Sequence, residues 1–350
     1  MPAALATAGT TAKPRIHSLD AIRTVAILGV VAIHCDPFTG RMLGPEWTLL
    51  GSLIDLLSRF AVPFFLVTAG YFLGVKSREG RPPLLFVASF AWRLLGLTLF
   101  WYAFYIFWPV DWQASIDHGF LRVAYWNATS LFGSASRLLD GPRVHLWFLS
   151  ALLIGGLHIA LLWSTVRTRF VIFYVVALYA LGLTNGAYSA IPEVAAFNPS
   201  LSGRLALPPL LIALGWSVAT RSNLVRPAAA LTLFLTGTAL FVGEAWFLHQ
   251  AYGVPLSGHD FLLGTPLQAV GLLALAVAHP DWGAKTPLPT WGRYTLGVYA
   301  AHVAVMEALG ARAPGDNLAW EASKPLFVYV LTLALVVGLS RIRVLRRVML

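Results

Sequence analysis

The sequence predicts an all-α polytopic membrane protein with about ten transmembrane helices and both termini in the cytoplasm. Three observations predict this fold class. Hydrophobic residues make up 58% of the 350 residues, charged residues make up 11%, and the mean hydropathy is +0.72. Apolar runs of about 20 residues, long enough to cross a bilayer, recur along the whole chain. Lysine and arginine gather in alternate loops between these runs. A soluble domain carries about 25% charged residues, so this composition excludes a single water-soluble core.

Apolar length and the intervening polar segments delimit the candidate spans. In chain order they are 17–36, 49–75, 85–108, 144–163, 169–185, 204–220, 226–248, 261–279, 291–310 and 322–341. We therefore expect three regions. Residues 1–16 form a cytoplasmic N-terminal tail, residues 17–341 form the membrane domain, and residues 342–350 form a short basic cytoplasmic tail.

The basic residues orient the chain. With the N-terminus in the cytoplasm, the inner segments hold fifteen lysines and arginines against two acids, whereas the outer segments hold seven against ten. This asymmetry follows the positive-inside rule for an even number of spans. The net charge of +10 therefore indicates topology and contact with anionic membrane lipid, and it does not indicate nucleic-acid binding.

The first span carries three ionisable residues, Asp20, Arg23 and His34. Each charged group at the centre of a bilayer costs on the order of 2.5 kcal/mol or more, so such residues usually face a bundle interior and mark function. On a helix, Arg23 and His34 share one stripe about 16 Å long, and Asp20 neighbours Arg23. The stripe suits an anion anchor at one end and proton transfer at the other. The alternative is a pair, Asp20 and Arg23, at the membrane edge with His34 in the outer interface.

Several later spans contain groups that need a partner or a purpose. The second span contains Arg59, which requires a counter-charge or water, together with Gly70 and Gly74, for which we expect close helix packing. The fourth span opens with His145 and Trp147, at the level where His34 emerges.

Two further spans carry candidate site residues. Glu244 in the seventh span is an isolated carboxylate among apolar residues, a candidate partner for a histidine or an arginine. In the ninth span Tyr299 and His302 are three residues apart and share a helix face.

The outer segment 109–143 and its start at Trp108 are rich in aromatic residues. Trp108, Trp112, Tyr125 and Trp126 lie beside acids and arginines, a mixture that suits a carbohydrate. The alternative is membrane-interface anchoring, where Trp and Tyr are common.

Motifs of several enzyme classes are missing from the sequence. It contains no phosphate-binding glycine loop, no CxxC, no HExxH and no GxSxG pattern, so neither a P-loop motor nor a zinc hydrolase is supported and we expect no metal. Cys35 is the only cysteine, which excludes an intramolecular disulfide. We expect it to be a small apolar filler, with a nucleophile as the alternative.

Four motifs appear in order along the chain. They are Leu19-Asp20-Ala-Ile-Arg23-Thr-Val-Ala26 followed by His34, Pro63-Phe64-Phe65 with Gly70, His145-Leu-Trp147-Phe-Leu149, and Gly292-x-x-Thr295-Leu-x-x-Tyr299-x-x-His302. The chain thereby resembles the integral-membrane acyltransferases of the acyltransferase type-three family, which O-acylate cell-surface glycans. Ala69 replaces the serine that usually precedes Gly70. Many members carry paired arginines entering the third span, where this chain has Arg93, with Arg78 and Arg81 upstream. We expect a stand-alone form without a soluble esterase-like domain.

The resemblance implies an O-acyltransferase of the bacterial cell membrane. Its co-substrate would be cytoplasmic acyl-CoA, with acetyl as the expected group, and its acceptor a hydroxyl of a surface or lipid-linked glycan. Arg23 would bind a phosphate of coenzyme A and Asp20 would orient it, while His34 would act as general base. Further donor contacts would come from Arg78, Arg81 and Arg93. Contacts to the acceptor would come from His145, Trp147, Glu244, Tyr299 and His302.

Two alternatives stay open. In the first, the acyl group passes through a covalent acyl-His34 or acyl-Cys35 intermediate. In the second, the chain is a ten-helix secondary transporter that uses the same intramembrane charges. Such folds often contain internal repeats, and the absence of a second copy of the Arg23-to-His34 pattern counts against a transporter.

Overall fold

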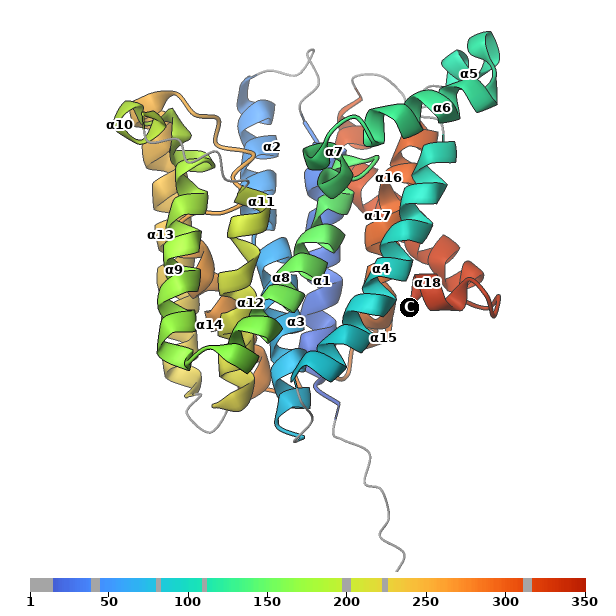
Figure 1. Cartoon of the computed structure of the whole chain (residues 1–350). Coiled ribbons are helices and arrows are strands. Elements are labelled where there is room, and N and C mark those ends of the chain that lie inside the picture. Colours follow the sequence, from blue (N-terminus) through green and yellow to red (C-terminus); the bar gives the residue numbers. More distant parts are fainter. Residues whose placement is uncertain are drawn as a thin grey trace, which may run out of the picture.

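The computed structural model describes residues 15–38, 45–79, 83–108, 112–196, 203–221, 226–310 and 317–350. These residues form helices and connecting turns without a strand, which confirms the all-α fold class. Most of the long helices run side by side in one bundle, and α6, α7 and α10 lie toward one end of it (Figure 1).

The long helices are α1 (His17–Cys35), α2 (Pro45–Ser58), α3 (Ala61–Ser77), α4 (Pro83–Phe107), α8 (Trp147–Thr165), α9 (Thr168–Thr184), α12 (Pro208–Thr220), α13 (Pro227–Tyr252), α14 (Gly264–Ala278), α16 (Thr295–Gly310) and α17 (Leu318–Leu339). Shorter elements connect them: α5 (Trp112–His118), α6 (Phe120–Leu131), α7 (Ala135–Asp140), η1 (Val144–Leu146), η2 (Ala187–Ala190), α10 (Pro192–Ala195), α11 (Gly203–Ala206), α15 (Leu288–Trp291), η4 (Gly292–Tyr294) and α18 (Arg346–Met349).

Within the described ranges, seven helical stretches are long and apolar enough to cross a membrane. They are His17–Cys35, Glu46–Ser77, Leu85–Phe107, Val144–Thr165, Gly203–Thr220, Pro227–Tyr252 and Leu318–Leu339. Helices α9 and α14 are apolar but shorter, and α16 has 16 residues. Each of the ten predicted intervals contains a helix. The chain is thus a multi-pass membrane protein, while the count of ten crossings and the cytoplasmic location of the termini stay predictions.

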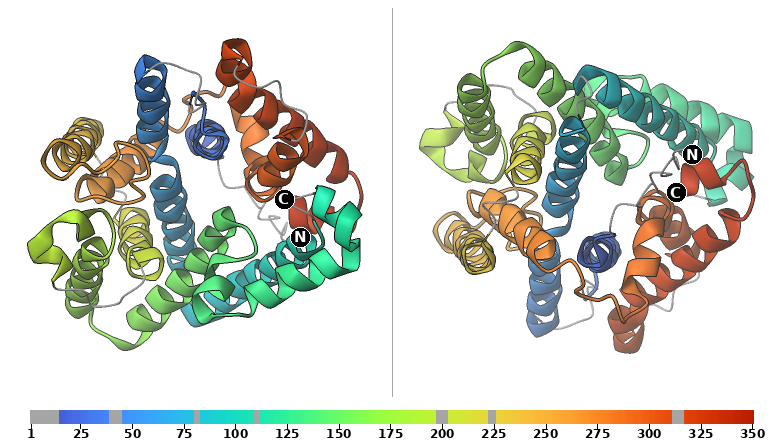
Figure 2. Two further views of the ribbon diagram at one scale, coloured as in Figure 1. Left: turned by 90° about the horizontal axis from the view of Figure 1, so that it is seen from above. Right: turned by 90° about the horizontal axis from the view of Figure 1, so that it is seen from below.

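Helix α1 lies near the middle of the bundle (Figure 2) and contacts α2, α3, α14, α15, α16 and α17. Its sequence explains this position. Leu19, Ala21, Ile27 and Val31 are all buried although they lie on different sides of the helix, so apolar residues surround it instead of forming one stripe, which is the pattern of a buried helix. The ionisable residues of α1 therefore face other helices of the bundle.

Helices α3 and α12 cross at glycines. A Cβ atom built on Gly70 would lie 2.1 Å from the carbonyl oxygen of Ile212, and one on Gly215 would lie 1.8 Å from that of Val67. Only glycine allows two backbones to approach this closely. The predicted packing role of Gly70 agrees with this crossing, which fixes the wall of the cavity described below.

We expect Gly215→Ala to destabilise the protein by at least about 1–3 kcal/mol, because its methyl group would overlap the backbone of α3. The measurement is the temperature of half-loss of the monodisperse peak in detergent. Gly243→Ala on α13 is the control, since a Cβ there meets nothing within 4 Å. Equal midpoints for the two variants would contradict the close crossing.

The C-terminal segment folds back onto the bundle. Helix α18 contacts α16 and α17, and Met349 is buried. The guanidinium of Arg93 on α4 donates to the carbonyl oxygen of Leu350 at 2.8 Å. Part of the predicted tail 342–350 therefore packs against α16 and α17 and contacts α4.

Candidate active site

Three histidines from distant parts of the sequence meet in one cluster. His34 is near the end of α1, His145 lies in η1 and His302 lies on α16. The ring centroid of His34 is 5.9 Å from that of His145 and 5.0 Å from that of His302. The rings of His145 and His302 are 5.1 Å apart. The sequence placed His145 at the level of His34, and the structure adds His302. We call these residues the histidine cluster.

Two tyrosines hold the cluster in place. Tyr299 donates its hydroxyl proton to the backbone carbonyl of His145, and its ring packs 5.6 Å from that of His145. The ring of Tyr105 also packs against His145, with the two ring centroids 5.3 Å apart. Its hydroxyl donates to the carbonyl oxygen of Ala300 at 2.8 Å. Tyr299 and His302 share one face of α16, as their spacing predicted. Tyr105 belongs to none of the sequence motifs, so sequence reasoning could not identify it as a site residue.

Backbone contacts fix which ring nitrogen carries a proton. Nδ1 of His34 lies 2.9 Å from the carbonyl oxygen of Val30, and Nδ1 of His302 lies 2.7 Å from that of Tyr299. A carbonyl oxygen only accepts, so in a neutral ring these nitrogens carry the hydrogen and Nε2 is left as the acceptor. His34 Nε2 can therefore accept a proton from a substrate.

The three histidines differ in accessibility. His145 is 1% exposed and His302 is 0% exposed, whereas His34 is partly exposed. A substrate can reach only a ring that is open to it, so His34 is the member of the cluster best placed for chemistry. Over the described ranges, no group of three or more His, Cys, Asp or Glu residues is arranged to hold a metal ion.

Arg59 finds two acidic partners. It contacts Asp55 one helical turn earlier at 2.6 Å and Asp260 of the α13–α14 loop at 2.5 Å. All three charges act electrostatically on the ring of His34. The sequence predicted that Arg59 needs a partner but did not identify either acid. The i, i+4 spacing of Asp55 is a usable signal, whereas Asp260 comes from a distant loop.

A cavity of about 320 Å³ lies on the side of the cluster that is predicted to face the cytoplasm. Three cations, Arg23, Lys76 and Arg93, line it. Apolar side chains such as Phe65 form much of its wall. Tyr299, which contacts the histidine cluster, also lines it. We call it the inner cavity. The inner cavity thus joins a cationic region to a tyrosine that touches His145.

Arg23 is held in the inner cavity by two side chains. It donates to Asp20 at 3.3 Å and to the hydroxyl of Thr295 at 3.0 Å. Asp20 also contacts Arg15 at 2.7 Å, so one carboxylate is shared by two guanidinium groups. The pairing of Asp20 with Arg23 was expected, and the sharing leaves a local excess of positive charge that suits an anion.

The other arginines predicted to contact the donor differ in where they lie. Arg93 lines the inner cavity. Arg78 donates to the carbonyl oxygen of Ala219 at 3.1 Å and is not among the lining residues, so its predicted donor contact has no support from this placement. Arg81 lies outside the described residues. Sequence reasoning did not single out Lys76 or Thr68 as lining residues. The Thr68 hydroxyl is buried in this wall without a hydrogen-bond partner in the described structure.

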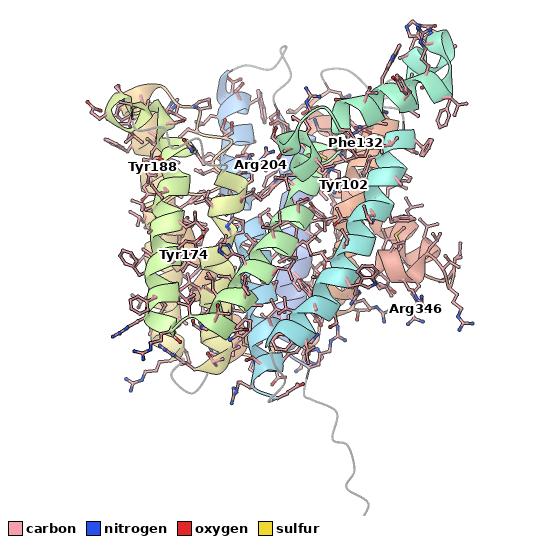
Figure 3. The ribbon with its side chains drawn as sticks, viewed as in Figure 1. Tyr102, Phe132, Tyr174, Tyr188, Arg204 and Arg346 are labelled. Atoms are coloured by element: carbon pink, nitrogen blue, oxygen red, sulfur yellow. The ribbon has the colours of Figure 1, made fainter. Side chains whose placement is uncertain are left out.

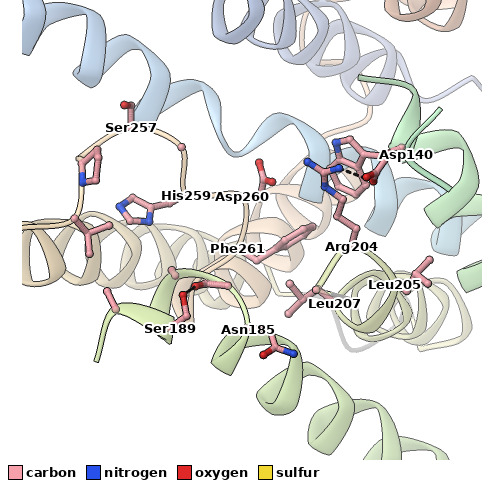
Figure 4. Close-up of a pocket in the computed structure, with 18 of the residues that line it drawn as sticks. Asp140, Asn185, Ser189, Arg204, Leu205, Leu207, Ser257, His259, Asp260 and Phe261 are labelled. Atoms are coloured by element: carbon pink, nitrogen blue, oxygen red, sulfur yellow. Dashed lines mark hydrogen bonds and ion pairs between the residues drawn. The ribbon is translucent and has the colours of Figure 1, made fainter. Parts of the chain in front are cut away.

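A second cavity, of about 750 Å³, is lined by residues of α7, α8, α11 and the α13–α14 loop (Figure 4). We call it the outer cavity. Trp147, two residues after His145, lines it, as do Arg204 and Asp260. Arg204 pairs with Asp140 at 2.5 Å, and its guanidinium lies 5.6 Å from the centroid of the Trp147 ring. Arg204 lies toward the end of the bundle that carries α7, far along it from Arg346 (Figure 3).

Glu244 and the aromatic segment lie elsewhere. Glu244 accepts from the backbone N–H of Gly264 at 3.3 Å and lines neither cavity, so its predicted acceptor contact has no support from this placement. Tyr125 and Trp126 are exposed on α6, and they also lie outside both linings. This favours the interface-anchoring alternative for their rings. The side chain of Trp112 lies outside the described residues.

Comparisons with known proteins agree with the motifs. A family model described as an acyltransferase domain, of the acyltransferase type-three group, matches residues 16–342. The chain is 26% identical over 304 residues to a serine/alanine racemase of Enterococcus gallinarum, which covers 81% of this chain and 40% of that protein. It is 24% identical over 317 residues to an amino-acid racemase of Enterococcus faecalis, covering 84% of this chain and 41% of that protein.

This chain spans about two fifths of the length of these two relatives. No solved structure matches it. The family model, however, covers nearly the whole chain, from before α1 to the end of α17. The chain therefore belongs to the acyltransferase type-three family.

Proposed function

We propose that this protein transfers an acyl group, with acetyl as the expected group, from cytoplasmic acyl-CoA to a sugar hydroxyl on the opposite side of the cell membrane. One observation carries the proposal. Tyr299 lines the inner cavity and contacts His145 and His302, and the rings of these histidines pack against His34. A donor that fills the inner cavity would therefore end beside the accessible base.

The inner cavity has the chemistry of a coenzyme A arm. Arg23, Lys76 and Arg93 supply positive charge, and a guanidinium binds phosphate oxygens through two parallel hydrogen bonds. The apolar wall suits the pantetheine chain and a short acyl group. The unpartnered hydroxyl of Thr68 offers a hydrogen bond to an amide of that chain, which would remove the penalty of a buried polar group.

The proposed chemistry is direct transfer. Nε2 of His34 takes the proton of the acceptor hydroxyl as the oxygen attacks the thioester carbonyl carbon. A C–O bond forms and the C–S bond breaks, so that coenzyme A leaves as a thiolate. The imidazolium of His34 then returns its proton to the sulfur. Both products are neutral at the reacting atoms and the base is regenerated.

A covalent route remains the alternative chemistry. The Cys35 thiol is 6% exposed, which disfavours it as a nucleophile, so an acyl-enzyme would form on His34. Acetyl-CoA added without acceptor distinguishes the routes. Direct transfer predicts no labelled protein in the denatured mass spectrum, whereas a stable acetyl adduct on His34 would establish the covalent route.

The proposal is tested with the purified chain in lipid nanodiscs and radiolabelled acetyl-CoA. We expect release of coenzyme A that depends on an added sugar acceptor, and label on that sugar. Absence of coenzyme A release with every acyl donor tried, together with solute uptake in proteoliposomes, would replace the proposal by the transporter alternative. Racemisation stays a property of the two longer relatives.

Thr68→Val tests the fit of the donor. We expect the KM for acetyl-CoA to rise about threefold to tenfold, because one neutral hydrogen bond contributes about 0.5–1.5 kcal/mol. Thr98→Val on α4 is the control, since the Thr98 hydroxyl already donates to Leu94 within its own helix at 2.8 Å and does not line the cavity. An unchanged KM in Thr68→Val would remove Thr68 from the donor site.

A further inference from the structure

The outer cavity is formed by segments that are far apart in the sequence. Residues from α7, the start of α8, η2, α11 and the loop between α13 and α14 line it. Each of these segments lies in a stretch that the charge pattern predicts to be outside the cytoplasm or at the outer end of a span. Its volume of about 750 Å³ is within the range of about 300–1,000 Å³ that is typical of small-molecule sites.

We propose that the outer cavity is the acceptor cleft and that it takes an uncharged sugar. This inference rests on the proposed function, because it assigns the second substrate of the same reaction to a place in the fold. The occupant follows from three properties of the lining: hydrogen-bonding groups, an aromatic wall and charged groups that are already paired.

The hydrogen-bonding groups suit a ligand rich in hydroxyls. They alternate with apolar side chains around the cavity (Figure 4) and comprise Ser136, Asp140, Asn185, Ser189, Arg204, Ser257, His259 and Asp260. Sugars present hydroxyls around an apolar ring face, and Trp147 and Phe261 supply aromatic surface in the same cavity. A purely apolar ligand would leave the buried Nε2 of His259 without a hydrogen bond, which disfavours such a ligand.

His259 provides an independent indication of a ligand. Its side chain lines the cavity and is only 4% exposed, yet its Nε2 has no hydrogen-bond partner in the described part of the chain. Burial lowers the pKa of His259, so the ring is neutral near pH 7. A neutral imidazole left unpaired in a buried wall is stabilised by a hydroxyl, which both donates and accepts.

Each charged side chain of the cleft has an oppositely charged partner. Arg204 is paired with Asp140, and Asp260 is paired with Arg59, which also holds Asp55. The acids outnumber the arginines in this set, so no cation is left over for a carboxylate ligand. A uronic or sialic acid would therefore meet uncompensated negative charge, which favours a neutral sugar.

Asp260 connects the cleft to the base. It lines the outer cavity, contacts Arg59 at 2.5 Å and, like Arg59, acts electrostatically on His34. Two residues that closely follow His145 in the chain line different cavities: Trp147 lines the cleft and Phe148 lines the inner cavity. A sugar in the outer cavity and a thioester in the inner cavity would thus meet at the histidine cluster.

The experiment uses the full chain in nanodiscs with methyl glucoside as the neutral probe and methyl glucuronide, its C6 carboxylate counterpart, as the charged one. Binding is measured by saturation-transfer NMR, and acetyl transfer is measured with labelled acetyl-CoA. We expect saturation transfer to methyl glucoside and a clearly weaker signal for methyl glucuronide. Equal or stronger binding of the glucuronide, or no binding of either sugar, would overturn the assignment.

Two substitutions locate the site. We expect Arg204→Gln and Asn185→Ala each to raise the KM for methyl glucoside about tenfold, the equivalent of about 1.4 kcal/mol, without changing coenzyme A binding. Arg137→Gln is the matched control, because Arg137 is exposed on α7, bonds to Ser130 and lies outside the lining. Unchanged methyl glucoside binding in both cleft variants would place the acceptor elsewhere.

Different results would contradict the proposed function and the cleft assignment. Wild-type protein that binds coenzyme A and methyl glucoside but transfers no label would contradict the proposed function and leave the cleft standing only as a binding site for a neutral sugar. Wild-type protein that transfers label with equal KM in Arg204→Gln, Asn185→Ala and Arg137→Gln would retain the function and contradict the cleft.

Discussion

His34→Ala is expected to lower acyl transfer by about 10²–10⁴-fold, which is the usual contribution of a positioned general base. In the histidine cluster only His34 is partly open, while His145 and His302 are fully buried. No second ring can therefore reach the acceptor hydroxyl in its place. The measurement is the transfer of label from acetyl-CoA to the sugar at saturating concentrations of both, which reports on kcat.

A matched histidine separates chemistry from folding. His158 on α8 packs against Tyr174 of α9 at 5.4 Å and lines neither cavity, so His158→Ala should retain activity. Coenzyme A binding should survive in His34→Ala, because Arg23 and the inner cavity are unchanged. Full transfer activity in His34→Ala would contradict the assignment of the base.

Arg23→Gln is expected to raise the KM for acetyl-CoA by about 10–150-fold, because a hydrogen bond to a charged group contributes about 1.5–3 kcal/mol. Arg23→Lys should recover only part of this loss, since an ammonium cannot bind phosphate through two parallel bonds. The kcat should change little, because Arg23 contacts Asp20 and Thr295 and is separated from His34 by three turns of α1.

A truncated donor tests this role directly. S-acetylpantetheine carries the thioester and the pantetheine arm but no phosphate. We expect wild type and Arg23→Gln to use it equally well, so that the difference between them appears only with acetyl-CoA. An equal loss with both donors would show that Arg23 supports the fold or the chemistry and does not bind phosphate.

Sequence patterns were sufficient for the fold class and for most of its spans. Long apolar runs produce long helices, and an ionisable group in such a run must face the bundle, which is why Arg23 and His34 could be identified. The structure differs from the predicted spans where helices are short or broken. Residues 49–75 correspond to two helices, α2 and α3, and α16 follows the short elements α15 and η4.

The site was only partly predictable. Helical spacing placed Tyr299 and His302 on one face, and motif order identified His145 and Trp147. The outer cavity could not be predicted, because Arg204, His259 and Asp260 lie beside or within loops whose mutual positions depend on how the spans pack. Glu244 shows the converse, since this isolated carboxylate accepts the N–H of Gly264 on the neighbouring helix α14 and lines neither cavity.

The proposed reaction runs from the inner cavity to the outer cavity. Cations and apolar side chains line the inner cavity, paired charges and hydrogen-bonding groups line the outer cavity, and residues that contact the histidine cluster line both. In this account neither substrate crosses the membrane. Only the acyl group passes, from the Arg23 end of α1 to the His34 end.

The most direct test is sided transfer in sealed proteoliposomes of known orientation. Labelled acetyl-CoA is supplied on the side of the inner cavity, and methyl glucoside is confined to the side of the outer cavity. The account predicts acetylated methyl glucoside, with its label, on the side opposite the donor, and none with His34→Ala. Label that appears on the sugar only when both substrates share one side would contradict it.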